Sequence, residues 1–262
     1  MTRAGSGAVA LKATAPLTAT RALWRLLRAV LHGLHGIAIV LLRFPSLPLE
    51  ARRERVRWWS AKLLAVLGVR LQVDGTVRPG ATLLVANHVS WLDIAAVHAV
   101  APHARFVSKA DVRHWPLVSR LVDAAGTLYI ERERTRDALR VVHQMADALR
   151  AGDTVAVFPE GTTSDGRGLL PFHANLLQAA IATGTPVQPA ALSFSDAAHD
   201  VSPAAAYVGE TSLLECLWAI ACAEGMVVRV ILRPAIATPH ADRRALAARL
   251  RDEIAQALGI ES

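Results

Sequence analysis

The sequence predicts an α/β fold: a mixed, largely parallel sheet covered by helices on both faces, preceded by an N-terminal membrane-associating helical hairpin. Two observations support this class. After Gly68, short apolar runs alternate with helical patterns, which is typical of such a sheet with helices packed on both faces. Before Gly68, the chain is basic and apolar and carries two helical patterns. With 262 residues, the chain is long enough for one large α/β domain.

The N-terminal quarter is expected to contain two regions. Residues 1–20 are small and polar and lack the pattern of a signal peptide, so we expect a disordered lead-in. Residues 21–67 are expected to form a basic amphipathic helical hairpin, broken at Pro45 and Pro48. Its apolar stretch over 29–42 is shorter than the ~20 residues of a spanning helix, which favours a helix lying in the membrane interface. A hairpin packed on the protein's own core is the alternative.

The positive charge of the chain is concentrated in the same region. Lys and Arg number 29 against 22 Asp and Glu, giving a net charge of +7, and residues 1–60 hold ten basic residues against two acidic ones. These basic residues flank apolar runs, and Trp58 and Trp59 follow the Arg-rich start of the second helix. We therefore expect an anionic membrane surface as a partner. Nucleic acid is not expected, because that would want basic residues and aromatics interleaved along a groove-reading element.

Residues 68–262 are expected to form the α/β domain. Seven short apolar runs are predicted to be strands, at Leu71–Val73, Thr82–Ala86, Arg105–Ser108, Thr127–Ile130, Thr154–Phe158, Val187–Ser193 and Val227–Leu232. Helices are predicted near 91–100, 115–124, 134–150, 172–183, 211–222 and 241–258. The apolar segment Leu213–Ala223 fits a buried core helix better than a second membrane contact.

The first candidate site segment directly follows the strand at 82–86, and reactive groups collect where such strands end. It runs from Asn87 to Asp93. His88 is a natural base at neutral pH, because the unperturbed pKa of histidine is near 6.5. Asp93 can orient the imidazole and stabilise its protonated form if the loop turns into a helix. The alternative is that Asp93 only caps a helix and His88 is a surface residue.

Two further segments also follow predicted strands directly. Arg132, after the strand at 127–130, offers a forked set of donors suited to a phosphate, although taken alone it better fits a surface ion pair with Glu131 or Glu133. In the third segment, Glu160 precedes Gly161, which permits close backbone approach, and Thr162, which adds a hydroxyl. An ordinary turn with a helix cap would also explain that segment.

Several classes of site are not expected. The two cysteines, Cys216 and Cys222, are too few for a disulfide-stapled scaffold or a thiolate metal cluster, and no other group has metal-ligand spacing, so no metal is expected. No GxSxG elbow occurs, which disfavours a serine hydrolase. No GxGxxG or GxxxxGK[ST] string occurs, which removes the usual nucleotide-binding signals.

Taken together, these segments resemble the glycerolipid (lysophospholipid) acyltransferase family over about residues 65–235. The family's block NHxSxxD matches Asn87, His88, Ser90 and Asp93, and its FPEGT block matches the segment from Phe158. Weaker second and fourth blocks correspond to Glu131-Arg132 and Val187-Gln188-Pro189. The resemblance implies a catalytic pair, His88 and Asp93. It implies substrate-binding roles for Asn87, Ser90, Arg132, Glu160, Gly161 and Thr162, with backbone N–H groups after Asn87 stabilising an oxyanion.

The resemblance also implies a reaction. A fatty acyl group would move from acyl-CoA or acyl carrier protein, as co-substrate and without a cofactor, to the free sn-2 hydroxyl of 1-acyl-sn-glycerol-3-phosphate, making phosphatidic acid. The enzyme would be peripheral or monotopic on the cytoplasmic face of a bacterial inner membrane. Thr163 stands where the family often has Arg and His173 where many members have Lys, which leaves another acceptor open, such as lyso-ornithine lipid. A hydrolase using the pair on water, and a non-catalytic lipid-binding protein, are the alternatives from other classes.

Overall fold

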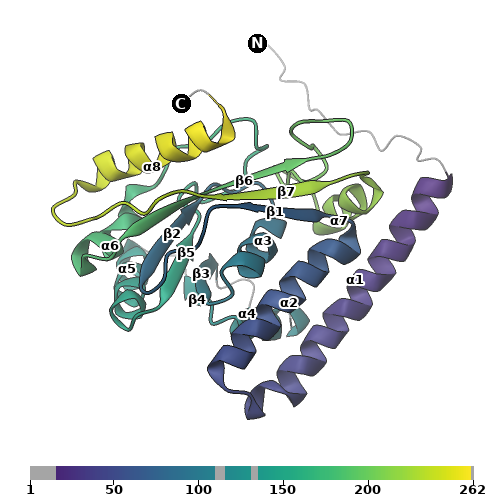
Figure 1. The fold of residues 1–262 in the computed structure, drawn as a ribbon, viewed down its shortest axis with the longest axis horizontal. Coiled ribbons are helices and arrows are strands. Elements are labelled where there is room, and N and C mark those ends of the chain that lie inside the picture. Colours follow the sequence, from purple (N-terminus) through teal and green to yellow (C-terminus); the bar gives the residue numbers. More distant parts are fainter. Residues whose placement is uncertain (1–15, 110–115, 131–134, 261–262) are drawn as a thin grey trace.

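The computed structural model describes residues 16–109, 116–130 and 135–260. Within these ranges, seven strands form one sheet in the order β1-β7-β6-β2-β5-β3-β4 (Figure 1). The strands are β1 Arg70–Asp74, β2 Thr82–Ala86, β3 Ala104–Lys109, β4 Leu128–Ile130, β5 Thr154–Val157, β6 Val187–Ser195 and β7 Val227–Leu232. All seven lie where the sequence predicts strands.

The sheet is mixed and largely parallel, as predicted. Strands β6, β2, β5, β3 and β4 run parallel to one another, and β7 joins β6 antiparallel, with β1 parallel to β7 beyond it. β2 and β5 are buried along their whole length. This burial explains why they read as continuous apolar runs rather than alternating ones.

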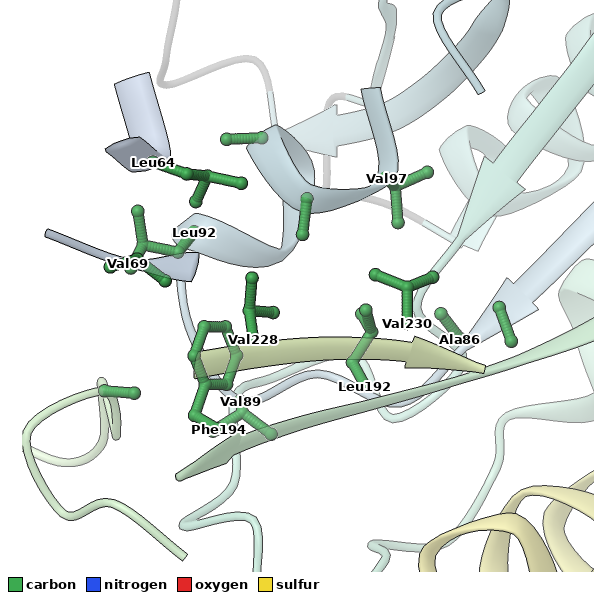
Figure 2. Packing of buried hydrophobic residues seen from close by; sticks show 14 of the residues in the cluster. Leu64, Val69, Ala86, Val89, Leu92, Val97, Leu192, Phe194, Val228 and Val230 are labelled. Atoms are coloured by element: carbon green, nitrogen blue, oxygen red, sulfur yellow. The ribbon is translucent and has the colours of Figure 1, made fainter. Parts of the chain in front are cut away.

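Helices cover both faces of the sheet. They are α3 Leu92–Val100, α4 Pro116–Ala124, α5 Thr135–Arg150, α6 Gln178–Thr183 after the 3₁₀ turn Ala174–Leu177, α7 Leu213–Cys222 and α8 Arg243–Leu258. One apolar cluster joins α2, α3 and α7 to a face of the sheet, and the other joins α5, α6 and α8 to the opposite face. Figure 2 shows the first cluster, where Leu64, Leu92 and Val97 pack over side chains of β6 and β7.

The N-terminal hairpin consists of α1 Pro16–Leu42, a 3₁₀ turn Phe44–Ser46 and α2 Leu49–Leu67. The turn contains one of the two predicted breaking prolines, Pro45, and α2 begins directly after the other, Pro48. Gly68 ends α2 in the left-handed conformation, with φ of 84°. The hairpin is thus present where it is predicted.

Two expectations about the first helix need correction. Residues 16–20 belong to α1 rather than to a lead-in, since a proline is tolerated in the first helical turn, where its missing N–H has no partner to lose. Residues 1–15 lie outside the described ranges. The apolar part is also not limited to 29–42, because residues Thr18–Leu42 form one helix that is long and apolar enough to cross a membrane. Arg21, Arg25 and Arg28 interrupt the apolar sequence near the start of this helix, but the helix continues through them.

The inner side of the hairpin is fastened by a reciprocal contact between His32 and Trp59. The His32 ring bonds the Trp59 carbonyl oxygen through Nε2 at 2.9 Å, and the Trp59 indole N–H donates to the His32 carbonyl oxygen at 3.1 Å. The two rings stack with centroids 5.2 Å apart. Gly36 is required beside them, because a Cβ at this position would lie 2.3 Å from Trp59 Nε1. α2 also contacts the protein core through Leu64 and Leu67, which are completely buried, whereas α1 leaves Leu27 and Val30 exposed. The hairpin therefore packs on the protein's own core, the alternative stated above, over only part of its surface.

Candidate active site

The central strand β2 delivers the first candidate segment to the carboxyl edge of the sheet. β2 ends at Ala86, and α3 begins at Leu92. Its parallel neighbour β5 ends at Val157, so the loop that starts at Phe158 emerges beside it. Adjacent parallel strands place their following loops together, which is why this edge commonly holds functional sites.

His88 and Asp93 meet within this loop. The His88 Nδ1 atom lies 2.8 Å from Asp93 Oδ2, and the same oxygen accepts the backbone N–H groups of Val89 at 2.7 Å and Ser90 at 2.9 Å. The Asp93 side chain is fully buried, whereas that of His88 is 19% exposed. Because a carboxylate accepts, Nδ1 carries the proton, and Nε2 is left with a lone pair for a substrate proton. The role of Asp93 therefore exceeds that of a helix cap.

Both backbone groups of His88 connect its loop to the loop after β5. The His88 N–H donates to Glu160 Oε1 at 3.3 Å, and the His88 carbonyl oxygen accepts the Ser164 N–H at 2.8 Å. The Ser164 hydroxyl donates to the same oxygen at 3.2 Å. The two strongest sequence motifs thus form one hydrogen-bonded unit around the imidazole.

An aromatic stack, which sequence reasoning missed, supports the imidazole from one side. The Phe158 ring lies parallel to the His88 ring, with centroids 4.0 Å apart and an interplanar angle of 6°. Phe106 of β3 stacks behind Phe158 at 5.4 Å, and His98 meets Phe106 edge to face. Burial lowers the pKa of His98 to about 4, so this second histidine is neutral and donates to the Ala104 carbonyl oxygen. In the sequence, Phe158 is noted only as the first residue of the FPEGT block, and no role is predicted for its side chain.

Glu160 lies at the base of the site with little exposed surface. Burial raises the pKa of its carboxyl group to about 7, and the backbone N–H groups of His88 and Leu170 oppose this shift only in part. The carboxyl group therefore changes charge near neutral pH. Its contact with His88 is the hydrogen bond from the backbone N–H.

Gly161 and Thr162 lie at the outer side of the same loop. Gly161 has a φ of 72°, and a Cβ there would lie 3.2 Å from Cδ2 of the His173 ring. The glycine is therefore needed both for the left-handed backbone and for the close approach of His173. Thr162 is exposed beside it. Both residues, and His173, are open to a ligand.

Asn87 and Ser90, which are expected to bind substrate, are both buried in the structure. The Asn87 amide donates to the Leu192 carbonyl oxygen at 2.9 Å, and its oxygen accepts the Leu192 N–H at 2.7 Å. The amide group thereby extends the ladder between β2 and β6, and it is fully occupied. Ser90 is completely buried, and its N–H is bound to Asp93. Both residues hold the shape of the loop.

The expected oxyanion donors are also occupied. The backbone N–H groups of Val89 and Ser90 both point to Asp93, and that of His88 points to Glu160. These three groups are bound to side chains of the protein and hold the shape of the loop that carries His88, here called the catalytic loop because of its expected role.

Arg132 lies outside the described residues. In the described part of the chain, no group of three or more His, Cys, Asp or Glu side chains could hold a metal ion.

Thr163 fixes a third segment to the site. Its hydroxyl donates to the Tyr207 carbonyl oxygen, and the Tyr207 N–H donates to the Val89 carbonyl oxygen at 3.1 Å. The threonine that replaces a frequent arginine is thus engaged with the protein itself. It brings no positive charge to the segment beside the His88 loop.

The chain is similar to known proteins over the region that contains these loops. The Acyltransferase family model matches residues 70–193, which include both loops. A lyso-ornithine lipid O-acyltransferase from Pseudomonas aeruginosa is 38% identical over 238 residues, covering 89% of this chain and 91% of that protein. A 1-acyl-sn-glycerol-3-phosphate acyltransferase from Neisseria meningitidis is 35% identical over 208 residues, covering 78% of this chain and 81% of that protein.

The fold has a counterpart among solved structures. The crystal structure of the 1-acyl-sn-glycerophosphate (LPA) acyltransferase PlsC from Thermotoga maritima aligns with a TM-score of 0.67 over 90% of this chain and 96% of that chain. The sequence identity to it is 19%, so this likeness concerns the fold. The two relatives described above are similar to this chain in sequence over most of its length. The chain belongs to the glycerolipid acyltransferase family.

Proposed function

We propose that His88 acts as a general base that removes the hydroxyl proton of a lysolipid while the resulting oxygen nucleophile attacks the carbonyl carbon of an acyl thioester. The single observation that supports this role is the His88–Asp93 contact, which holds the proton on Nδ1 and leaves Nε2 free. The tetrahedral intermediate then expels the thiolate, and the imidazolium returns the proton to the sulfur. Asp93 stabilises the imidazolium between these two steps.

The reaction proceeds by direct transfer without an acyl-enzyme. A serine or cysteine nucleophile would have to stand within hydrogen-bond reach of the base. Ser90 is buried with its side chain beside Cys216 of α7, and Ser164 is bound to the His88 carbonyl oxygen. Acyl-CoA and acyl carrier protein are both suitable donors, because either supplies the thioester.

The acceptor that these observations favour is a zwitterionic lysolipid such as lyso-ornithine lipid. Thr163 brings no charge to a phosphate, and its hydroxyl is already bound to Tyr207. The relative from Pseudomonas aeruginosa, aligned over nearly its whole length, is named a lyso-ornithine lipid O-acyltransferase. 1-Acyl-sn-glycerol-3-phosphate is the second candidate, supported by the relative from Neisseria meningitidis and by Arg132, which suits a phosphate.

A competition assay tests the acceptor. Purified full-length protein is given equal amounts of lyso-ornithine lipid and 1-acyl-sn-glycerol-3-phosphate with one acyl thioester, and the products are separated by mass. We expect faster loss of lyso-ornithine lipid; preferential formation of phosphatidic acid would support the second acceptor. The variant His88→Ala should lose transfer to both acceptors with its fold unchanged. Free fatty acid as the main product would instead indicate a hydrolase.

The bilayer is the proposed location of the reaction, on its cytoplasmic side. α1 exposes an apolar face along most of its length, including Leu27, Val30 and Leu34. α1 packs against α2, and α2 carries the basic residues Arg52, Arg53, Arg55, Arg57 and Lys62. A crossing α1 would draw these charges into hydrocarbon, which is costly, so a hairpin lying in the interface is favoured. Replacing Leu27 and Leu34 by Glu should release the protein from anionic vesicles.

A further inference from the structure

α7 has an apolar edge that the protein core does not use. Leu214 is 77% exposed, and Trp218, one helical turn later, is partly exposed beside it. The other side of the helix carries Cys216 and Ile220, which are buried in the core. The composition of this segment predicts a buried core helix, and the structure shows that only one side of the helix is buried. One side packs on the core, and the other presents Leu and Trp to the surroundings.

This edge is fixed next to α1. α7 packs along the first turns of α1, and the two helices lie side by side in Figure 1. Arg25 donates to the carbonyl oxygens of Ala221 at 2.9 Å and Ala223 at 2.8 Å, where α7 ends. Arg21 forms an ion pair with Glu224 at 2.7 Å. Guanidinium groups on the last carbonyls of a helix satisfy acceptors that lack helical partners. The position of α7 relative to α1 is thus set by several directed bonds.

The neighbouring turns of α1 expose side chains of the same kind. Leu23, Trp24 and Leu27 are each about half exposed or more. Soluble proteins rarely leave a contiguous apolar surface of this extent open. Tryptophan beside arginine at one end of an apolar face is the composition that suits the headgroup layer of a bilayer, where the ring and the N–H each find a favourable environment.

We propose that the α7 edge formed by Leu214 and Trp218 enters the lipid interface together with the apolar face of α1, so that the protein contacts the membrane through two separate parts of its sequence. The proposal rests on the membrane location given under the proposed function. The expected occupant is a bilayer rather than a second copy of the chain, because α7 packs against α1, whose exposed face is long, apolar and bordered by arginine.

The placement has a consequence for the site. The Cys216 thiol, on the inner side of α7, lies beside the side chains of Ser90 and Trp91 in the catalytic loop. α7 and this loop also share one apolar cluster, through Ile220 and Val89. If the outer side of α7 contacts the membrane, only the thickness of this helix separates the lipid interface from the loop that carries His88.

Vesicle flotation tests the proposal. Full-length wild type and the variants Leu214→Glu and Leu214→Phe are mixed with vesicles of phosphatidylglycerol and phosphatidylethanolamine, without any substrate. The matched control is Leu139→Glu, since Leu139 is 63% exposed on α5, which covers the opposite face of the sheet. Burial of one leucine corresponds to about a tenfold or larger change in partitioning. We expect Leu214→Glu to weaken binding by about that factor, and Leu214→Phe and Leu139→Glu to bind as wild type does.

A second measurement places Trp218 in the bilayer directly. Vesicles with brominated acyl chains should quench the fluorescence of the wild type more than that of Trp218→Phe. Equal quenching, or equal vesicle binding by Leu214→Glu and Leu139→Glu, would overturn the proposal. Loss of a dimer in Leu214→Glu with unchanged vesicle binding would assign the edge to a second copy. Because neither measurement requires turnover, a failure here is distinct from a failure of the proposed reaction.

Discussion

The Phe158 ring lies face to face with the His88 imidazole, 4.0 Å away and within 6° of parallel. The Phe158 ring cannot accept or donate the substrate proton. It limits how far the imidazole can turn about the axis of its hydrogen bond to Asp93, a motion that this bond does not prevent. Phe106 stands behind it in the core, so Phe158 itself has little freedom to move. The base is therefore oriented by a carboxylate on one edge and by an aromatic face on the other.

We expect Phe158→Leu to lower kcat by roughly two- to tenfold, the range that corresponds to an aromatic pair worth ~0.5–1.5 kcal/mol. KM for the lysolipid should change little, since Phe158 contacts the base and not the acceptor. Phe158→Tyr keeps the flat ring and is the control. Steady-state kinetics with one acceptor decides the matter, and a rise in KM at constant kcat would mean that Phe158 contacts substrate instead.

The strands and the contact between His88 and Asp93 could be predicted because both are local in sequence. Runs such as Thr82–Ala86 are apolar and bounded by turns, and His88 and Asp93 are joined by a single short loop. The strand order could not be predicted, because the antiparallel pairing of β6 with β7 depends on contacts between distant segments. The stacking of Phe158 on His88 and the hydrogen bonds between Asn87 and Leu192 also join segments that are far apart in the sequence. Neither contact can be inferred from the residues of one segment alone.

Glu160 should make the stability of the protein depend on pH. The pKa of its carboxyl group is about 7 in the folded chain and near 4.5 when unfolded, so the folded state binds more protons between these values. Its contribution is therefore favourable below pH 4.5 and is lost as the pH rises through 7. At ~1.4 kcal/mol per pKa unit, the loss is roughly 3.5 kcal/mol at most.

Glu160→Gln removes this titration, because the amide stays neutral. Urea unfolding of both proteins at pH 5 and pH 7.5 should show that the free energy of unfolding falls more steeply with pH in the wild type. Parallel behaviour of the two proteins would mean that Glu160 is ionised throughout and that its burial is compensated.

Asn87 should be a stability residue. In Asn87→Ala, the Leu192 N–H and carbonyl oxygen would both remain buried without a partner, which costs about 2–4 kcal/mol in the free energy of unfolding. Thr162→Ala, at an exposed position of the same site, should change stability by less than ~0.5 kcal/mol. Urea unfolding measures both. If Asn87→Ala kept its stability and raised KM for the lysolipid, the original substrate-binding role would be restored.

The pair Gly161 and His173 allows backbone strain to be separated from steric contact. Gly161→Ala introduces a Cβ 3.2 Å from the His173 ring and forces a residue with a side chain to a φ of 72°. The backbone part costs ~1–2 kcal/mol, and the contact adds to it. In the double variant Gly161→Ala, His173→Ala, the stability lost to the steric contact should be recovered, but not the stability lost to backbone strain. The coupling energy between the two substitutions should therefore be favourable, but smaller than the full loss of stability in Gly161→Ala. Urea unfolding of the wild type, both single variants and the double variant measures this coupling, and strictly additive losses would show that the His173 ring moves away freely.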